Sequence, residues 1–135
     1  MIEFLPLHPK VTLLIYQKVD VFCPCALNHS INKKTLNDLQ CRAIVGSANN
    51  QMENQRVENA VFSKGILYGV DYAVNAGGLV SVVDQYQNGG THDHARIMAK
   101  LAPIQTKIEH VFAACASTGL SPAIVSDRMV EAVLT

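Results

Sequence analysis

The chain has 135 residues, of which 49% are apolar, and this size and composition are typical of one globular domain. Eleven Lys and Arg balance eleven Asp and Glu, so the chain lacks the basic footprint that nucleic-acid binding requires. No stretch approaches the ~18 consecutive apolar residues of a membrane span, and the N-terminus does not resemble a secretory signal. We therefore expect a cytoplasmic protein that contacts neither nucleic acid nor membrane.

The four cysteines are Cys23, Cys25, Cys41 and Cys115, and their spacing does not match a metal site. A zinc site normally needs a second Cys or His pair at ligand spacing, and the sequence offers none. We expect no bound metal and interpret the cysteines as small residues of tight loops in a reducing compartment.

The first half of the chain predicts short strands separated by helices. Residues 1–10 are expected to be irregular because of their two prolines, and residues 11–16 form either a strand or an added segment. Short apolar runs predict strands at 19–22, 43–45 and 66–68. Asn32 would cap a helix over 32–40, and Gly65 would end a helix over 56–63. Strands that are connected through helices lie parallel in one sheet.

The second half predicts a loop and then helices, at 71–75, 77–86, 94–117 and from 122 onward. Asp93 is a candidate N-cap, and Pro103 should kink or split the long helix that Gly119 ends. Ser121 would cap the last helix, with proline in its first position. The order of elements predicts an α/β fold, namely a partial Rossmann-like parallel sheet of three to four strands with C-terminal helices, about half of a doubly wound domain.

Small and amide residues follow each expected strand. They include Cys25 after the first strand, Asn49 and Asn50 after the second, and Asn75 after the third. The carboxyl ends of parallel strands meet at one edge of a sheet, so we expect these residues to lie together there. From spacing alone, the asparagines could equally be turn and cap residues. The sequence has no G-x-G-x-x-G, the cradle for a dinucleotide pyrophosphate.

Four segments resemble motifs of the amino-acid dehydrogenases, the family of the leucine, phenylalanine, valine and glutamate enzymes. Residues 19–27, Val-Asp-Val-Phe-Cys-Pro-Cys-Ala-Leu, resemble D-[IV]-F-x-P-C-A-L, and residues 46–51, Gly-Ser-Ala-Asn-Asn-Gln, resemble a second signature. Residues 71–78 resemble D-Y-x-x-N-A-G-G, and Ser-Asp-Arg-Met at 126–129 is similar to A-D-R-[ML]. The motifs follow the family's order over about residues 13–133, and the leucine dehydrogenase branch is the most similar.

The resemblance implies the second half of the family's NAD-binding domain with its C-terminal helices. It implies NAD as cofactor, with the nicotinamide end held by Cys25, Ala26, Ala48, Asn49, Asn50 and Asn75. Positions matching Leu79 and Val82 would line the pocket for the substrate side chain. The implied reaction is the oxidative deamination of a branched-chain or other apolar L-amino acid to its 2-oxo acid.

The chain also departs from the family. The family's catalytic lysines and aspartate lie in an N-terminal substrate domain that these residues do not include, so we expect no catalytic residue here. Residues 1–12 are divergent, and Asn28 and His29 replace the usual glycine; Asn28 tolerates a left-handed backbone, and His29 would crowd the ring pocket. We expect residues 1–135 to be one truncated NAD-binding domain, inactive alone, that forms a homo-oligomer or binds a missing half. The alternative is a catalytically dead remnant that serves as an interaction or oligomerisation module.

Overall fold

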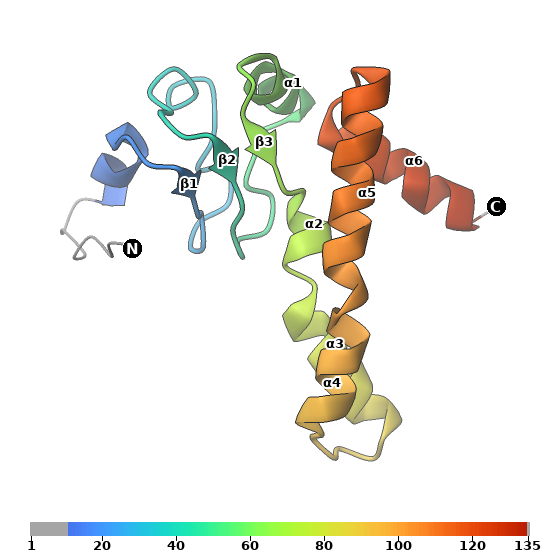
Figure 1. Ribbon diagram of the computed structural model, residues 1–135. Helices are drawn as coiled ribbons and strands as arrows, with labels where there is room; N and C mark the ends of the chain where they lie inside the picture. Colours follow the sequence, from blue (N-terminus) through green and yellow to red (C-terminus); the bar gives the residue numbers. More distant parts are fainter. Residues whose placement is uncertain (1–10, 135) are drawn as a thin grey trace.

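The computed structural model describes residues 11–134, and its centre is a parallel three-stranded sheet. The strands lie in the order β1 (Val21–Phe22), β2 (Ala43–Ile44) and β3 (Leu67–Tyr68), side by side in Figure 1. Val21 pairs with Ala43, and Ala43 pairs with Leu67, so the strands form continuous rows. The expected α/β class and the parallel strands are confirmed. The irregular segment expected at residues 1–10 lies outside the described residues.

Of the two alternatives for residues 11–16, the strand is wrong. The segment forms a 3-10 helix, η1 (Val11–Tyr16), which ends where Gln17 N–H donates to the Leu14 carbonyl at 3.1 Å. Beyond its end, Lys18 makes an isolated parallel bridge to Gln40. A strand needs a neighbour that takes up its backbone hydrogen bonds along its whole length, and the described chain provides none for this segment.

The helix expected at residues 32–40 is also wrong, because this stretch folds into turns. The Asn32 side-chain oxygen accepts from the Lys34 and Thr35 N–H groups at 2.9 and 3.3 Å. The Thr35 hydroxyl donates to the Ser30 carbonyl at 2.9 Å. Side-chain bonds of this kind compete with helical backbone bonds, so β1 connects to β2 through turns.

Helix α1 (Gln55–Ser63) begins and ends as its local sequence indicates. The Asn54 side chain caps it by accepting from the Arg56 and Val57 N–H groups at 3.0 and 3.2 Å. It ends before Gly65, which has a φ of +74° and therefore the left-handed conformation that glycine tolerates best.

The C-terminal half is helical, with two differences from expectation. The expected loop at 71–75 begins with a short helix, α2 (Asp71–Val74), and the others are α3 (Gly77–Gln87), α4 (His94–Leu101), α5 (Pro103–Thr118) and α6 (Pro122–Leu134). Pro103 separates α4 from α5, Asp93 caps α4, and Gly119 ends α5 with a φ of +70°. Ser121 does not cap α6 through its side chain, because its buried hydroxyl has no hydrogen-bond partner among the described residues.

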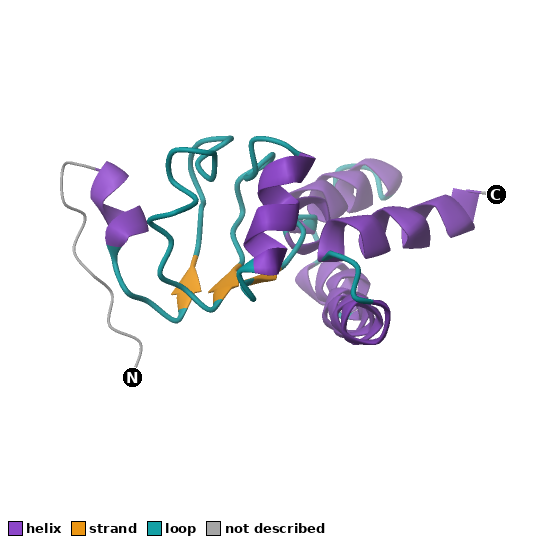
Figure 2. Cartoon of the chain, turned by 90° about the horizontal axis from the view of Figure 1, so that it is seen from above, coloured by secondary structure: helices purple, strands orange, loops and turns teal. Residues whose placement is uncertain are grey.

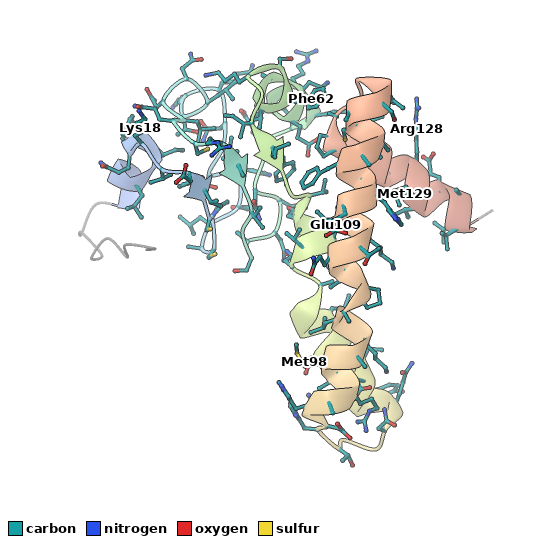
Figure 3. The ribbon with its side chains drawn as sticks, in the orientation of Figure 1. Lys18, Phe62, Met98, Glu109, Arg128 and Met129 are labelled. Carbon is teal, nitrogen blue, oxygen red and sulfur yellow. The ribbon has the colours of Figure 1, made fainter. Side chains whose placement is uncertain are left out.

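Two apolar clusters organise these elements. The larger joins the sheet, α1 and the turns, and includes Ile31, Ile44 and Val61, which are fully buried. The smaller joins α5 to α6 around Val111, and Phe62 of α1 packs against it (Figure 3). This second cluster connects the sheet region to the C-terminal helices.

Helices α3 and α4 form a hairpin that extends away from the sheet, as Figure 1 shows. Asp84 of α3 is fully buried and holds the hairpin through Arg96 and Lys100 of α4, with nitrogen–oxygen distances of 2.7 Å to each. Hydrogen bonds from Arg96 and then Lys100 lower the pKa of Asp84 to about 2. The hairpin therefore depends on a carboxylate that stays ionised at ordinary pH.

One side of the sheet carries no described helix. Figure 2 shows α1 on one side of the strands and the opposite side open. The row Val21, Ala43 and Leu67 lies on this open side, and Val21 and Leu67 are 50% and 52% exposed. We call these three residues the open row. The sheet is thus exposed on one face and packed on the other.

Within residues 11–134, no single helix is long and apolar enough to cross a membrane; α4–α5 and α6 satisfy length and composition only as a pair bent by 114°.

Candidate functional site

Three loops follow the carboxyl ends of the three strands and form one rim of the sheet. They are residues 23–27 after β1, 46–51 after β2 and 69–75 after β3. Since the strands are parallel, all three loops leave the sheet at the same edge. The structure thus confirms the expectation that Cys25, Asn49 and Asn75 lie at one edge.

The first loop packs directly against the second at Gly46. A Cβ atom at this position would lie 2.1 Å from the Pro24 carbonyl oxygen, so only glycine fits. The Ala48 N–H donates to the same oxygen at 3.0 Å. This contact holds the backbone of the first loop, which carries Cys25, against the backbone of the second loop, which carries Asn49.

Gln51 holds the second loop in shape from inside. Its side chain is fully buried, and its Nε2 donates to the Gly46 and Ala48 carbonyls at 2.7 and 2.9 Å. Its backbone N–H donates to an Asp71 carboxylate oxygen at 3.2 Å, which ties the second loop to α2. Gln51 and Asp71 were not predicted as site residues, although both fall within the motifs that resemble the dehydrogenases.

Asn49 and Asn75 join the second loop to the third. The Asn75 Nδ2 donates to the Asn49 Oδ1 at 2.6 Å and to the Ser47 carbonyl at 3.5 Å. Asn75 also ends α2 as its C-cap residue. The two amides therefore stabilise the turns, and they are also polar groups in direct contact with each other on the rim.

The remaining expected cofactor residues have different positions. Cys25 and Ala26 are exposed, and the Ser47 hydroxyl and then its N–H donate to the Cys25 sulfur, which lowers the pKa of the thiol. Ala48 is buried, with 6% of its surface exposed. Asn50 has a φ of +50°, and its carbonyl accepts from the His29 N–H at 2.7 Å.

The backbone conformation of His29 has a structural role next to the first loop. Asn28 tolerates a left-handed backbone, but the structure has the left-handed conformation at His29, with a φ of +50°. Its carbonyl accepts from the Asn32 side chain at 3.0 Å. The backbone of His29 thus connects the first loop to Asn50 and to the following turns.

Leu79 and Val82 lie on α3, directly after the third loop. They are 68% and 64% exposed, and they share one face of the helix with Val83 and Tyr86. Among the described residues this face has no apolar covering. The structure brings these two residues near the chain segment that carries Asn75, but it does not enclose them in a pocket.

Acidic and tyrosine side chains gather behind the third loop. The Tyr72 hydroxyl donates to Asp127 of α6 at 2.7 Å, and the Tyr68 hydroxyl accepts from the Asp71 N–H at 3.3 Å. Burial, and then Asp127 and Asp71, raise the pKa of Glu58. Burial is also the largest cause of the raised pKa of Tyr68 and of Tyr72. This cluster connects the rim to α6 through residues that are distant in sequence.

A hollow of the described surface lies away from the rim. It has a volume of about 470 Å³ and is lined by residues that include Asp20, Arg42, Lys64 and Leu67. These lie toward the amino ends of the strands, opposite the rim. Because the motif residues converge on the rim, we place the candidate site there and not in the hollow.

Comparison with known proteins shows the family of the chain. A family model, Glutamate/Leucine/Phenylalanine/Valine dehydrogenase, matches residues 5–133. The chain belongs to this family. It is 38% identical over 112 residues to the leucine dehydrogenase of Thermoactinomyces intermedius, covering 83% of this chain and 30% of that protein. It is 35% identical over 131 residues to the valine dehydrogenase of Streptomyces albus, covering 92% of this chain and 35% of that protein.

A solved member of the dehydrogenase class shares the fold. The crystal structure of L-tryptophan dehydrogenase from Nostoc punctiforme superposes with a TM-score of 0.81 at 32% identity, covering 90% of this chain and 35% of that one. The chain therefore spans about a third of the length of these relatives. The expected family and fold are confirmed.

Proposed function

We propose that these residues form the nicotinamide-side part of an NAD-dependent amino-acid dehydrogenase, within a single NAD-binding domain. The substrate would be a branched-chain or other apolar L-amino acid, oxidatively deaminated to the 2-oxo acid. The observation that supports this most directly is the contact between Asn49 and Asn75, 2.6 Å apart on the rim of a parallel sheet. When bound, NAD would supply the acceptor for the hydride from the α-carbon.

The chemistry of the rim fits the nicotinamide end of that cofactor. A carboxamide has one carbonyl acceptor and two N–H donors, and the rim offers complementary groups in the side-chain amides of Asn49 and Asn75 and the Ser47 carbonyl. Ala26 and Ala48 are small and leave room beside the ring. Cys25 and Asn50 complete the set through the first and second loops. In this proposal Leu79 and Val82 contact the substrate side chain.

The same residues do not fit the rest of the cofactor or the chemistry of proton transfer. The sequence has no G-x-G-x-x-G to hold a pyrophosphate. General base catalysis needs a lysine or similar group within hydrogen-bond reach of the substrate. Lys64 donates to the Leu36 carbonyl at 3.0 Å and lines the hollow opposite the rim. We therefore propose that these 135 residues alone do not turn over an amino acid.

Two measurements test these two parts separately. In a ¹⁵N-labelled sample, NADH should shift the side-chain amide signals of Asn49 and Asn75, and Asn75→Ala should abolish the shift at Asn49. Asn59→Ala is the matched control, because the Asn59 side chain is exposed on α1, away from the rim. Shifts confined to the hollow around Arg42 and Lys64 would refute the nicotinamide site.

The second measurement is NADH formation from leucine by the purified chain, which should remain at background. Turnover that survives purification and disappears in Asn49→Ala would show that the chain is an enzyme by itself.

The alternative function is an interaction or oligomerisation module. The observation that favours it is the open row, where Val21 and Leu67 are half-exposed, together with Val133 and Leu134 of α6, which are 85% and 80% exposed. In either case we propose a homo-oligomer or a partner that supplies the missing half, and a cytoplasmic location that suits four free cysteines.

A further inference from the structure

Two cysteines follow the end of β1 at Phe22, one on either side of Pro24. Val21, Cys23 and Cys25 are exposed, whereas Phe22 is half-buried and Pro24 is buried. Residues two apart in an extended chain point to the same side, and the alternating exposure follows that period. The Cys23 and Cys25 thiols therefore lie on the same accessible side of the chain.

The two thiols have different electrostatic surroundings. The Ser47 hydroxyl and N–H both donate to the Cys25 sulfur and lower its pKa, since they stabilise the thiolate. Burial, and then the neighbouring Cys25, raise the pKa of Cys23. The thiolate is the nucleophilic form of cysteine, so Cys25 is the more reactive member of the pair. Burial raises the pKa of both Cys41 and Cys115, which makes them less reactive.

The backbone between the two cysteines is fixed. The Pro24 carbonyl accepts from the Ala48 N–H at 3.0 Å and lies against Gly46, which has no room for a side chain. Two residues of extended chain span about 6.6 Å between Cα atoms. This distance is near the upper limit of about 6.8 Å for a disulfide. A disulfide between Cys23 and Cys25 would therefore be strained, and strained disulfides are readily reduced.

We propose that Cys23 and Cys25 form a peroxide-reactive dithiol on the rim, with Cys25 as the attacking thiolate and Cys23 as the resolving thiol. The Cys25 sulfur forms a bond to one peroxide oxygen, the O–O bond breaks, and hydroxide leaves with the electron pair. The sulfur is oxidised to a sulfenic acid, and the peroxide is reduced. The Cys23 thiolate then forms the S–S bond and displaces hydroxide from the Cys25 sulfur. Two thiols and one hydrogen peroxide give one disulfide and two waters.

This proposal goes beyond the dehydrogenase function and does not depend on it, because the thiol chemistry is measured directly. The purified, reduced chain is treated with hydrogen peroxide at neutral pH, and each cysteine is followed by peptide mass spectrometry. The peptide that holds both Cys23 and Cys25 should lose one pair of hydrogens and recover them with dithiothreitol. Its rate should exceed that of Cys41 and Cys115 by on the order of tenfold or more.

Variants assign the two roles. In Cys23→Ser the sulfenic acid should persist and be trapped by dimedone on Cys25, and in Cys25→Ser the fast phase should be lost. Ser47→Ala keeps both thiols and should slow the reaction by removing the hydroxyl that donates to Cys25. Circular dichroism checks that each variant is folded. If a variant does not fold, the peptide mass spectrometry of the wild-type chain still tests the proposal.

Equal oxidation rates at all four cysteines in the folded wild-type chain would overturn the proposal. Trapping of dimedone on Cys23 in place of Cys25 would overturn the assignment of the attacking thiol.

Discussion

Replacing Gly46 with alanine should separate the first two loops of the rim. The added Cβ would lie 2.1 Å from the Pro24 carbonyl oxygen and 2.7 Å from the Pro24 Cδ and nitrogen. Ordinary contacts of a carbon atom are about 3.5 Å or longer, so the two backbones must move apart by on the order of 1 Å. The obstacle is backbone and a proline ring, which cannot rotate away. A shift of this size breaks the 3.0 Å hydrogen bond from the Ala48 N–H to the Pro24 carbonyl.

The expected loss of folding free energy has two parts. Overpacking of a buried site costs about 1–3 kcal/mol, and the lost hydrogen bond costs about 1 kcal/mol more. The sum is about 2–4 kcal/mol. With a urea dependence of about 2 kcal/mol per molar, the unfolding midpoint of Gly46→Ala should fall by about 1–2 M.

Urea unfolding followed by circular dichroism tests this magnitude against a matched control. Gly78 lies on the exposed first turn of α3, and a Cβ there meets nothing within 4 Å. Gly78→Ala should therefore be stabilising by up to about 1 kcal/mol, because alanine favours a helix more than glycine does. If Gly46→Ala unfolds at the wild-type midpoint or above it, the close contact with Pro24 is not part of the folded rim.

Three further predictions concern α1 and the open surfaces. Glu58→Gln should raise the urea midpoint at pH 7, because the raised pKa of Glu58 means that its ionised form is disfavoured in the folded state. This gain should disappear as the pH falls below about 4.3, the pKa of Glu58 in the unfolded chain. Asn54→Ala should cost about 1 kcal/mol of folding free energy by removing the α1 cap, whereas Asn59→Ala should cost little. Equal losses of both variants in urea unfolding would show that the cap is wrongly assigned. Leu67→Glu should reduce self-association measured by light scattering, and a reduction only in Val133→Glu would place the contact on α6 and not on the open row.

The elements that the sequence predicts well are those with strong local signals. Gly65 and Gly119 end their helices with positive φ angles, and Pro103 separates two helices as expected. Each of these signals acts through the backbone of one or two residues, so it needs no knowledge of the tertiary structure. The strand alternative for 11–16 and the helix predicted for 32–40 failed because they depended on context. In the first case no adjacent strand is present, and in the second Asn32 and Thr35 satisfy the backbone differently.

The same division applies to the candidate site. The meeting of Cys25, Asn49 and Asn75 at one edge follows from parallel topology. The helix between β2 and β3 predicts this topology, and β1 and β2 are also parallel although turns connect them. The buried role of Gln51 does not follow from the sequence pattern, because it depends on two carbonyls that turn inward behind the loop. The bond between Tyr72 and Asp127 joins residues 55 positions apart, and no local pattern indicates it.

Three contacts that shape the rim lie within its own three loops. Gly46 packs on Pro24, Gln51 binds two carbonyls of its own loop, and Asn75 binds Asn49. Within the described chain, none of these contacts uses the open row, so the arrangement of the rim and the covering of that row are separable. A polypeptide that docked on the open row would therefore meet a rim that is already formed. Since preorganised groups cost less conformational entropy on binding, such a partner would need to order only itself.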